Sequence, residues 1–137
     1  MTDKVIHVAA AVIVRDGKIL IGQRPKGEWG QFEWEFPGGK LEPGEDPPTA
    51  LKRELREELA IEATIGGELD RYEHQYTGTP RVLLVFHLVK DFQGEPQNLA
   101  FEQIKWEAPE ALPTYAFLKG DVAFVDALAR GDYAAQL

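Results

Sequence analysis

The chain has 137 residues, of which 44% are hydrophobic, and this predicts one domain over residues 1–137 with an apolar core. It contains no cysteine, so disulfides and zinc–thiolate sites are excluded. The formal net charge of −8 repels a phosphate backbone and disfavours nucleic-acid polymers as partners, although the charge taken alone is explained first by solubility.

The first predicted elements are strands joined by turns. Val5 to Val14 is apolar and rich in β-branched residues, Asp16-Gly17 follows it, and Lys18 to Gly22 resumes the apolar pattern. This order predicts a β-hairpin with an Asp-Gly turn. Residues 24–33 are polar with two glycines and a proline, which predicts a loop, and residues 34–36 form a short strand after it.

A helix is predicted after this strand. Pro37-Gly38-Gly39 ends the strand, and Pro47-Pro48 can begin a helix because the first helical N–H groups have no partner to lose. The helix should run from about 47 to about 59, since an apolar stripe recurs there at helical spacing, formed by Ala50, Leu51, Leu55 and Leu59.

The second half of the chain reads mainly as strands. Residues 62–73 resemble a strand with Gly66-Gly67 inside it, and residues 81–90 are the most strand-like run that remains. A further short strand is expected at 104–106, and helices at 109–112 and 121–129, the last with Asp121 as its N-cap. A mixed sheet with two main helices is therefore predicted, arranged as one layered α/β domain.

Four glutamates crowd the segment around the first helix: Glu45, Glu54, Glu57 and Glu58. Helical geometry places the last three on one face about 100° wide, at the edge of the apolar stripe. Repulsion between Glu54 and Glu58 costs roughly 0.2–0.5 kcal/mol on an exposed helix, and more at a partly buried edge. Mg²⁺ or Mn²⁺ would remove this cost, and a metal beside a loop of free N–H groups suggests a phosphate substrate.

Two neighbours of the helix acids support this hypothesis. Arg53 can reach Glu57 one turn later and is assigned an orienting role, whereas Glu45 can fold back toward the same edge. The helical glutamates alone would favour a solvated acidic face. The glycine-rich loop and Glu45 shift the interpretation toward a metal site.

These residues resemble the signature of the Nudix hydrolase superfamily. The positions in register are Gly39, Glu45, Arg53, Glu54, Leu55, Glu57, Glu58 and Ile61, whereas Ala60 stands where the signature has glycine. Residues 34–40, Trp-Glu-Phe-Pro-Gly-Gly-Lys, are similar to the segment before the signature in the MutT-like branch. The resemblance implies an α+β fold with a mixed sheet sandwiched between helices. It also implies metal-dependent hydrolysis of (deoxy)nucleoside triphosphates to monophosphate and pyrophosphate.

The resemblance also implies catalytic roles. Glu54, Glu57 and Glu58 would bind the metal with the backbone of Gly39, and Glu45 would act in the outer part of the shell. Water activated by the metal would attack phosphorus while the metal neutralises the developing charge. The general base varies among relatives. Glu102 is a candidate here, although an exposed loop glutamate is the more ordinary interpretation.

The substrate contacts are less determined. Arg24 and Lys40 are candidates for phosphate contacts or ordinary surface charge, Phe36 for base stacking or core packing, and Gly38 belongs to the substrate loop. Asp121 stands where MutT-like proteins often place an Asn or Asp that reads the base, although a plain N-cap would also explain it. An ionised Asp only accepts hydrogen bonds. Trp29 and Trp106 are expected to be packing residues.

The expected partner is a small-molecule nucleotide, with oxidised nucleotides such as 8-oxo-dGTP among the candidates. Pyrimidine triphosphates, nucleotide sugars and a non-catalytic Nudix binding module remain as alternatives. No apolar run reaches the roughly 18 residues of a membrane span, and Met1 to Lys4 lacks the features of a signal peptide. We therefore expect a cytoplasmic monomer or homodimer without membrane contact.

Overall fold

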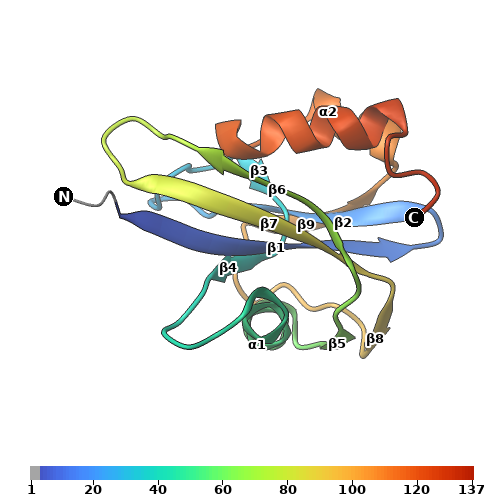
Figure 1. The fold of residues 1–137 in the computed structure, drawn as a ribbon. Coiled ribbons are helices and arrows are strands. Elements are labelled where there is room, and N and C mark those ends of the chain that lie inside the picture. The colour runs from blue at the N-terminus through green and yellow to red at the C-terminus, as the bar shows by residue number, and fades with distance from the viewer. Residues whose placement is uncertain (1–3) are drawn as a thin grey trace.

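A computed structural model describes residues 4–137, so the expectation for Met1 to Lys4 falls mostly outside the described residues. Within this range a mixed sheet has the order β3 (Trp34–Glu35), β2 (Lys18–Gln23), β1 (Val5–Arg15), β7 (Arg81–Val89), β6 (Glu68–His74). Two further strands join it: β4 (Gly38–Lys40) pairs with β1, and β9 (Gln103–Glu107) pairs with β2. Helix α1 (Pro47–Leu59) covers one face and α2 (Val122–Arg130) the other (Figure 1). The predicted sheet between helices is confirmed.

The predicted hairpin is present as β1 and β2. Val14 lies opposite Ile19, and the two-residue turn between the strands has positive φ at both Asp16 (53°) and Gly17 (75°). This backbone matches the twist of the flanking strands, which is why Asp-Gly is favoured there. β1 then pairs in parallel with β7, and this brings residues from the two halves of the chain together.

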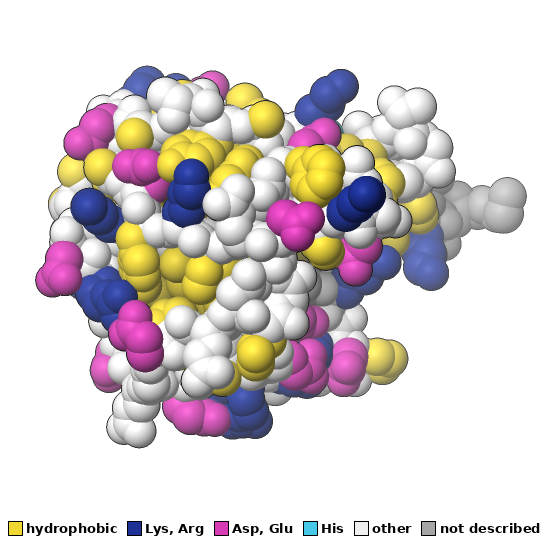
Figure 2. Space-filling view, turned by 180° about the vertical axis from the view of Figure 1, so that it is seen from behind, with side chains coloured by type: hydrophobic (Ala, Val, Ile, Leu, Met, Phe, Trp, Pro, Cys, Tyr) yellow, Lys and Arg dark blue, Asp and Glu magenta, His cyan; other side chains and the backbone are white. Residues whose placement is uncertain are grey.

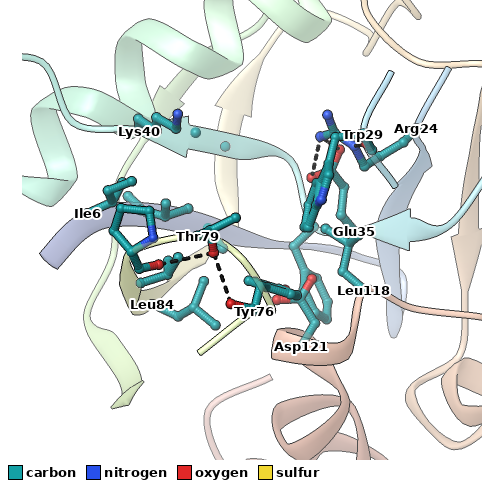
Figure 3. A pocket seen from close by; sticks show the side chains of 18 of the residues that line it. Ile6, Arg24, Trp29, Glu35, Lys40, Tyr76, Thr79, Leu84, Leu118 and Asp121 are labelled. Carbon is teal, nitrogen blue, oxygen red and sulfur yellow. Dashed lines mark hydrogen bonds and ion pairs between the residues drawn. The ribbon is translucent and has the colours of Figure 1, made fainter. Parts of the chain in front are cut away.

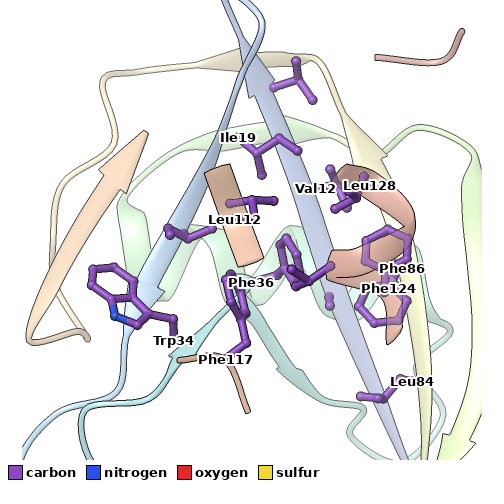
Figure 4. Packing of buried hydrophobic residues seen from close by; sticks show 14 residues of the cluster. Val12, Ile19, Trp34, Phe36, Leu84, Phe86, Leu112, Phe117, Phe124 and Leu128 are labelled. Atoms are coloured by element: carbon purple, nitrogen blue, oxygen red, sulfur yellow. The ribbon is translucent and has the colours of Figure 1, made fainter. Parts of the chain in front are cut away.

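The central strand β1 is buried on both faces. Val12 packs with Phe86 and Phe124 beneath α2, as Figure 4 shows. On the opposite face, Ile13 packs with Leu55 of α1. Because successive side chains of a strand point to opposite faces, the continuous apolar run at 5–14 supplies both cores at once.

Helix α1 has the bounds that the sequence predicts. Asp46 caps it by accepting a hydrogen bond from the Thr49 N–H (2.9 Å), and the next two positions are prolines. The helix ends at Leu59, and the C-cap residue that follows it, Ala60, has a left-handed backbone with φ of 56° and ψ of 35°. This conformation is the one that the missing signature glycine adopts without strain, so alanine takes it here at a conformational cost.

Strand prediction after α1 was partly wrong. Residues 62–73 divide into β5 (Glu62–Thr64) and β6, because Gly66 donates its N–H to Leu88 O (2.7 Å) between them. β5 pairs instead with β8 (Asp91–Gln93), an unpredicted strand, in a separate two-stranded sheet. Pro37-Gly38-Gly39 also does not end strand structure, since Gly38 and Gly39 pair with β1.

The C-terminal helices also differ from the prediction. Residues 109–112 lie in a 3₁₀ helix, η1 (Pro109–Thr114). A second 3₁₀ turn, η2 (Lys119–Asp121), precedes α2. Asp121 does not cap α2, because its backbone is helical (φ −91°, ψ −13°) and its side chain makes no capping bond.

The surface carries charges of both signs. On the face shown in Figure 2, acidic and basic side chains are intermixed, so the net charge of −8 is not gathered into one acidic field on that face. Among the helices of residues 4–137, none is long and apolar enough to cross a membrane.

Candidate active site

The site begins where β4 lies against α1. A Cβ atom on Gly39 would stand 2.7 Å from Glu54 Oε1, so any larger residue there would displace this carboxylate. The neighbouring Gly38 N–H donates to Glu58 Oε1 at 3.0 Å. The glycine-rich loop therefore holds two of the predicted acids through close approach and a backbone hydrogen bond.

Arg53 organises the acidic edge, but not mainly through Glu57 as predicted. Its Nε and Nη2 each donate to Glu45 at 2.8 Å, and its Nη1 donates to Glu54 at 3.0 Å. The contact with Glu57 is longer, at 3.4 Å. Glu45 does fold back onto the helix, yet it does so as the partner of Arg53, because a planar guanidinium pairs best with one carboxylate through two parallel bonds.

Electrostatics differ sharply among these acids. Paired with Arg53, Glu45 has its pKa lowered to about 2. Burial raises the pKa of Glu58 to about 9, and the nearby carboxylates of Glu54 and Glu35 add to the rise. The hydrogen bond from the Gly38 N–H acts in the opposite direction and lowers this pKa. Burial also raises the pKa of Glu54, even though Arg53 opposes it. Negative charge on α1 is thus only partly compensated by the protein.

The donor set fits a divalent cation. Within residues 4–137, no three His, Cys, Asp or Glu side chains converge in the arrangement of a metal site. Arg53 donates to oxygens of Glu54 and Glu57. The three helix glutamates nevertheless offer hard carboxylate oxygens beside the Gly39 backbone. Such oxygens are the ligands that Mg²⁺ and Mn²⁺ prefer, and a cation would offset the raised pKa of Glu58.

A pocket of about 420 Å³ extends from this edge into the domain. The lining includes Gly38, Gly39, Lys40 and Glu58 beside α1. It also includes aliphatic side chains, among them Ile6, Val8, Val82 and Leu84. Figure 3 shows Lys40 and Ile6 on one side of the pocket and Trp29, Glu35 and Asp121 on the other. The pocket thus joins the acidic edge to an apolar chamber.

Asp121 contributes a buried acid to this chamber. Its residue is only 6% exposed, it lines the pocket, and within residues 4–137 its carboxyl group has no hydrogen-bond or ion-pair partner. Burial raises its pKa to about 8, with a further contribution from Glu35. Among residues 4–137 no fully buried side-chain oxygen lacks a partner, so the carboxyl oxygens of Asp121 are accessible from the pocket, where a ligand can pair with them.

Two tyrosines fix the turn that carries this acid. Tyr72 Oη donates to Gly120 O at 2.6 Å, and Gly120 N–H donates to Tyr76 Oη at 2.9 Å. Because both groups of the Gly120 peptide backbone are held, the neighbouring Asp121 is held as well. The sequence offered no local signal for this, since Tyr72 and Gly120 are 48 residues apart.

Arg24 lies at the pocket, and each of its three guanidinium nitrogens has a partner within the protein. Its guanidinium donates to Glu35 (3.0 Å) and Glu28 (3.4 Å), and its Nε donates to Trp29 O (2.5 Å). The sequence analysis gave Arg24 two alternatives, a phosphate contact or ordinary surface charge. The structure adds a third role, because Arg24 anchors the 24–33 loop. Lys40 is exposed at the pocket edge.

The remaining predicted residues divide between core and surface. Phe36 is buried against Phe86, Phe117 and Phe124 and also lines the pocket, so it forms part of both. Glu102 is exposed and is not among the residues that line the pocket, and its backbone N–H donates to Gln23 O. Three residues earlier, Leu99 donates its backbone N–H to Glu58 O at 3.1 Å, so the loop that carries Glu102 lies against the end of α1. The role of Glu102 as general base stays a prediction.

Sequence reasoning missed most of the pocket lining, including Trp29, Glu35 and Tyr76. Trp29 was expected to pack, yet it is 55% exposed. A tryptophan in a polar loop beside a glycine was the available signal for a binding role. Trp106, in contrast, packs against the α1-side core as expected.

The family model for the NUDIX domain matches residues 5–128. The chain therefore belongs to this family and is a Nudix hydrolase. Within the family it is MutT-like, as its relatives and structural neighbours show.

Two curated relatives and one solved structure illustrate the likeness. The CTP pyrophosphohydrolase of Escherichia coli K12 is 42% identical over 124 residues, which cover 90% of this chain and 91% of that protein. An 8-oxo-dGTP diphosphatase of Haemophilus influenzae is 37% identical over 118 residues, covering 85% and 86%. The solution structure of the E. coli ORF135 protein superposes with a TM-score of 0.85 at 39% identity, covering 96% of this chain and 94% of that one.

Proposed function

We propose that this Nudix hydrolase cleaves nucleoside triphosphates to the monophosphate and pyrophosphate, with the base held in the apolar chamber and the phosphates at the α1 edge. The observation that carries the proposal is the continuity of one pocket. It runs from Glu58 and the Gly38-Gly39 backbone to the unpaired buried acid Asp121. A ligand that needs metal at one end and base recognition at the other fits this arrangement.

The proposed cofactor is Mg²⁺ or Mn²⁺, which Glu54, Glu57, Glu58 and the backbone of Gly39 would hold. When bound, such an ion supplies positive charge for the phosphate oxygens and lowers the pKa of a coordinated water. The chain itself orients the ligands: Arg53 fixes Glu54, and Glu45 fixes Arg53. Exposed Lys40 at the pocket edge is proposed to contact phosphate.

Asp121 is proposed to read the base edge. A protonated carboxyl group both donates and accepts hydrogen bonds, which complements cytosine, whose N3 accepts and whose 4-amino group donates. An ionised carboxylate would instead suit the two donors on the guanine edge. Burial favours the neutral form, and a 42% identical relative is named a CTP pyrophosphohydrolase. We therefore place cytidine triphosphates first.

An oxidised purine such as 8-oxo-dGTP is the second candidate, because several relatives carry the name 8-oxo-dGTP diphosphatase. The role would then be removal of damaged nucleotides. For either substrate we propose a cytoplasmic enzyme that acts as a monomer or homodimer on free nucleotides rather than on nucleic-acid polymers.

The test is pyrophosphate release with Mg²⁺ across CTP, dCTP, the other common triphosphates, 8-oxo-dGTP and a nucleotide sugar. Preference for CTP or dCTP supports the cytosine assignment, whereas preference for 8-oxo-dGTP transfers it to the second candidate. Release from none of these triphosphates would contradict the proposed reaction.

A further inference from the structure

Trp29 is an exposed aromatic residue at the rim of the pocket. Its side chain lines the pocket although the residue is 55% exposed. Its indole ring meets the Tyr76 ring edge to face, with centroids 4.9 Å apart. Figure 3 shows it on the same side as Glu35 and Asp121. An indole that is in contact with the pocket yet largely uncovered leaves apolar surface for a ligand to bury.

The backbone around Trp29 is held in place. Arg24 Nε donates to Trp29 O at 2.5 Å, and Arg24 is itself anchored by Glu35 at 3.0 Å. At Gly30, φ is 74° and an added Cβ would stand 2.8 Å from Leu118 Cδ2, so the loop packs closely on the start of the C-terminal segment. The loop backbone is therefore fixed by contacts on both sides of Trp29, and the indole is exposed even though its backbone is anchored.

A chain of contacts connects Trp29 to the proposed base-reading acid. Its ring packs on Tyr76, and the Tyr76 hydroxyl accepts from Gly120 N–H at 2.9 Å, immediately before Asp121. The indole and the carboxyl group are thus placed by the same tyrosine. Of the three aromatic residues that line the pocket, Phe36 is buried, Tyr76 is half-buried and Trp29 is exposed. The indole therefore offers the most uncovered aromatic surface to a planar base whose edge reaches Asp121.

We propose that Trp29 determines base binding by stacking on the nucleobase whose edge Asp121 reads. The inference rests on the proposed nucleotide function and extends it, because it assigns to the 24–33 loop a role in binding the base rather than the phosphates. Arg24 acts as a positioning residue that sets the indole. Stacking tolerates any base, so Trp29 supplies affinity while Asp121 supplies the choice among bases.

The experiment compares Trp29→Ala, Trp29→Phe and Phe32→Ala. Phe32 is a matched control, since it lies in the same loop, is 42% exposed and is not among the pocket-lining residues. Dissociation constants are measured by calorimetry with Mg²⁺ for CMP, dGMP and inorganic tripolyphosphate, which has phosphates but no base. Tryptophan fluorescence follows the same titrations, because the chain has only three tryptophans.

In Trp29→Ala the dissociation constants for CMP and dGMP should rise by about tenfold or more, because the indole is lost. In Trp29→Phe they should stay within about threefold of those of the unmodified protein. Tripolyphosphate should bind equally to all variants, and Phe32→Ala should match the unmodified protein. Nucleotide-induced quenching should be lost in Trp29→Phe. Monophosphate binding tests this inference even if no triphosphate is cleaved, so failure of the proposed reaction is seen separately.

Three results would overturn the stacking role. One is unchanged CMP and dGMP affinity in Trp29→Ala. Another is an equal loss of tripolyphosphate affinity, which would make the indole a general support of the site. The third is an unmodified protein that binds neither monophosphate.

Discussion

Glu45 and Arg53 form a two-point ion pair, with both carboxylate oxygens 2.8 Å from guanidinium nitrogens. The same guanidinium reaches Glu54 through its remaining nitrogen at 3.0 Å. A residue that precedes α1 therefore determines the orientation of an acid within it. Glu45 thus orients the proposed metal ligand Glu54 through Arg53, as residues that hydrogen-bond to metal ligands commonly do.

Replacing Glu45 by Gln should lower the apparent affinity for Mg²⁺ by about 10-fold or more, because Arg53 would lose its two-point anchor and Glu54 its orientation. Mg²⁺ titrations of pyrophosphate release measure this. Glu42→Gln is the control, since Glu42 is more exposed and lies 3.7 Å from Arg53. Equal behaviour of the two variants would contradict the orienting role.

Replacing Glu54 or Glu57 by Gln should reduce kcat by about 100-fold or more, because each change removes a proposed ligand of the ion that stabilises the developing charge. Circular dichroism should show an intact fold. Glu62→Gln, just beyond the helix and paired with Arg56 at 2.6 Å, serves as an acidic control. Near-normal turnover in both ligand variants would refute the metal assignment.

Asp121 should make folding stability fall as pH rises. The unfolded carboxyl group loses its proton above its ordinary pKa of 3.8, whereas burial holds the folded group protonated up to about 8. The folded state therefore binds more protons between these values, and stability declines across that window and levels off above it. Urea denaturation at a series of pH values measures the slope.

In Asp121→Asn this contribution should vanish, because an amide does not titrate. Glu35 and Glu58 also have raised pKa values, so the informative quantity is the difference between the two proteins. Parallel stability curves from pH 4 to pH 8 would show that Asp121 is ionised in the folded state.

Ala60→Gly should raise the free energy of unfolding by about 0.5–1 kcal/mol, since the left-handed backbone at position 60 (φ 56°) costs alanine more than glycine. Chemical denaturation provides the measurement. The same substitution at exposed Ala123 in α2 should lower stability, because glycine is a poor helix former. A loss of stability in both variants would mean that Ala60 bears no strain.

The sequence by itself determined α1, its bounds and its acidic edge. These features depend on residues within one or two helical turns of each other, where 3.6-residue periodicity and the preference of proline for the first helical turn apply directly. The hairpin at Asp16-Gly17 was predictable for the same local reason. Family membership followed because the signature lies in one contiguous segment.

Only the tertiary structure decided the end of the pocket around Asp121. The burial of Asp121 depends on Tyr72 and Tyr76, which lie 48 and 44 residues from Gly120. The pairing of Arg24 with Glu35 depends on the loop folding back onto β3. These pairings and this burial are stabilised by contacts between residues that lie far apart in the sequence, so no local sequence pattern predicts them.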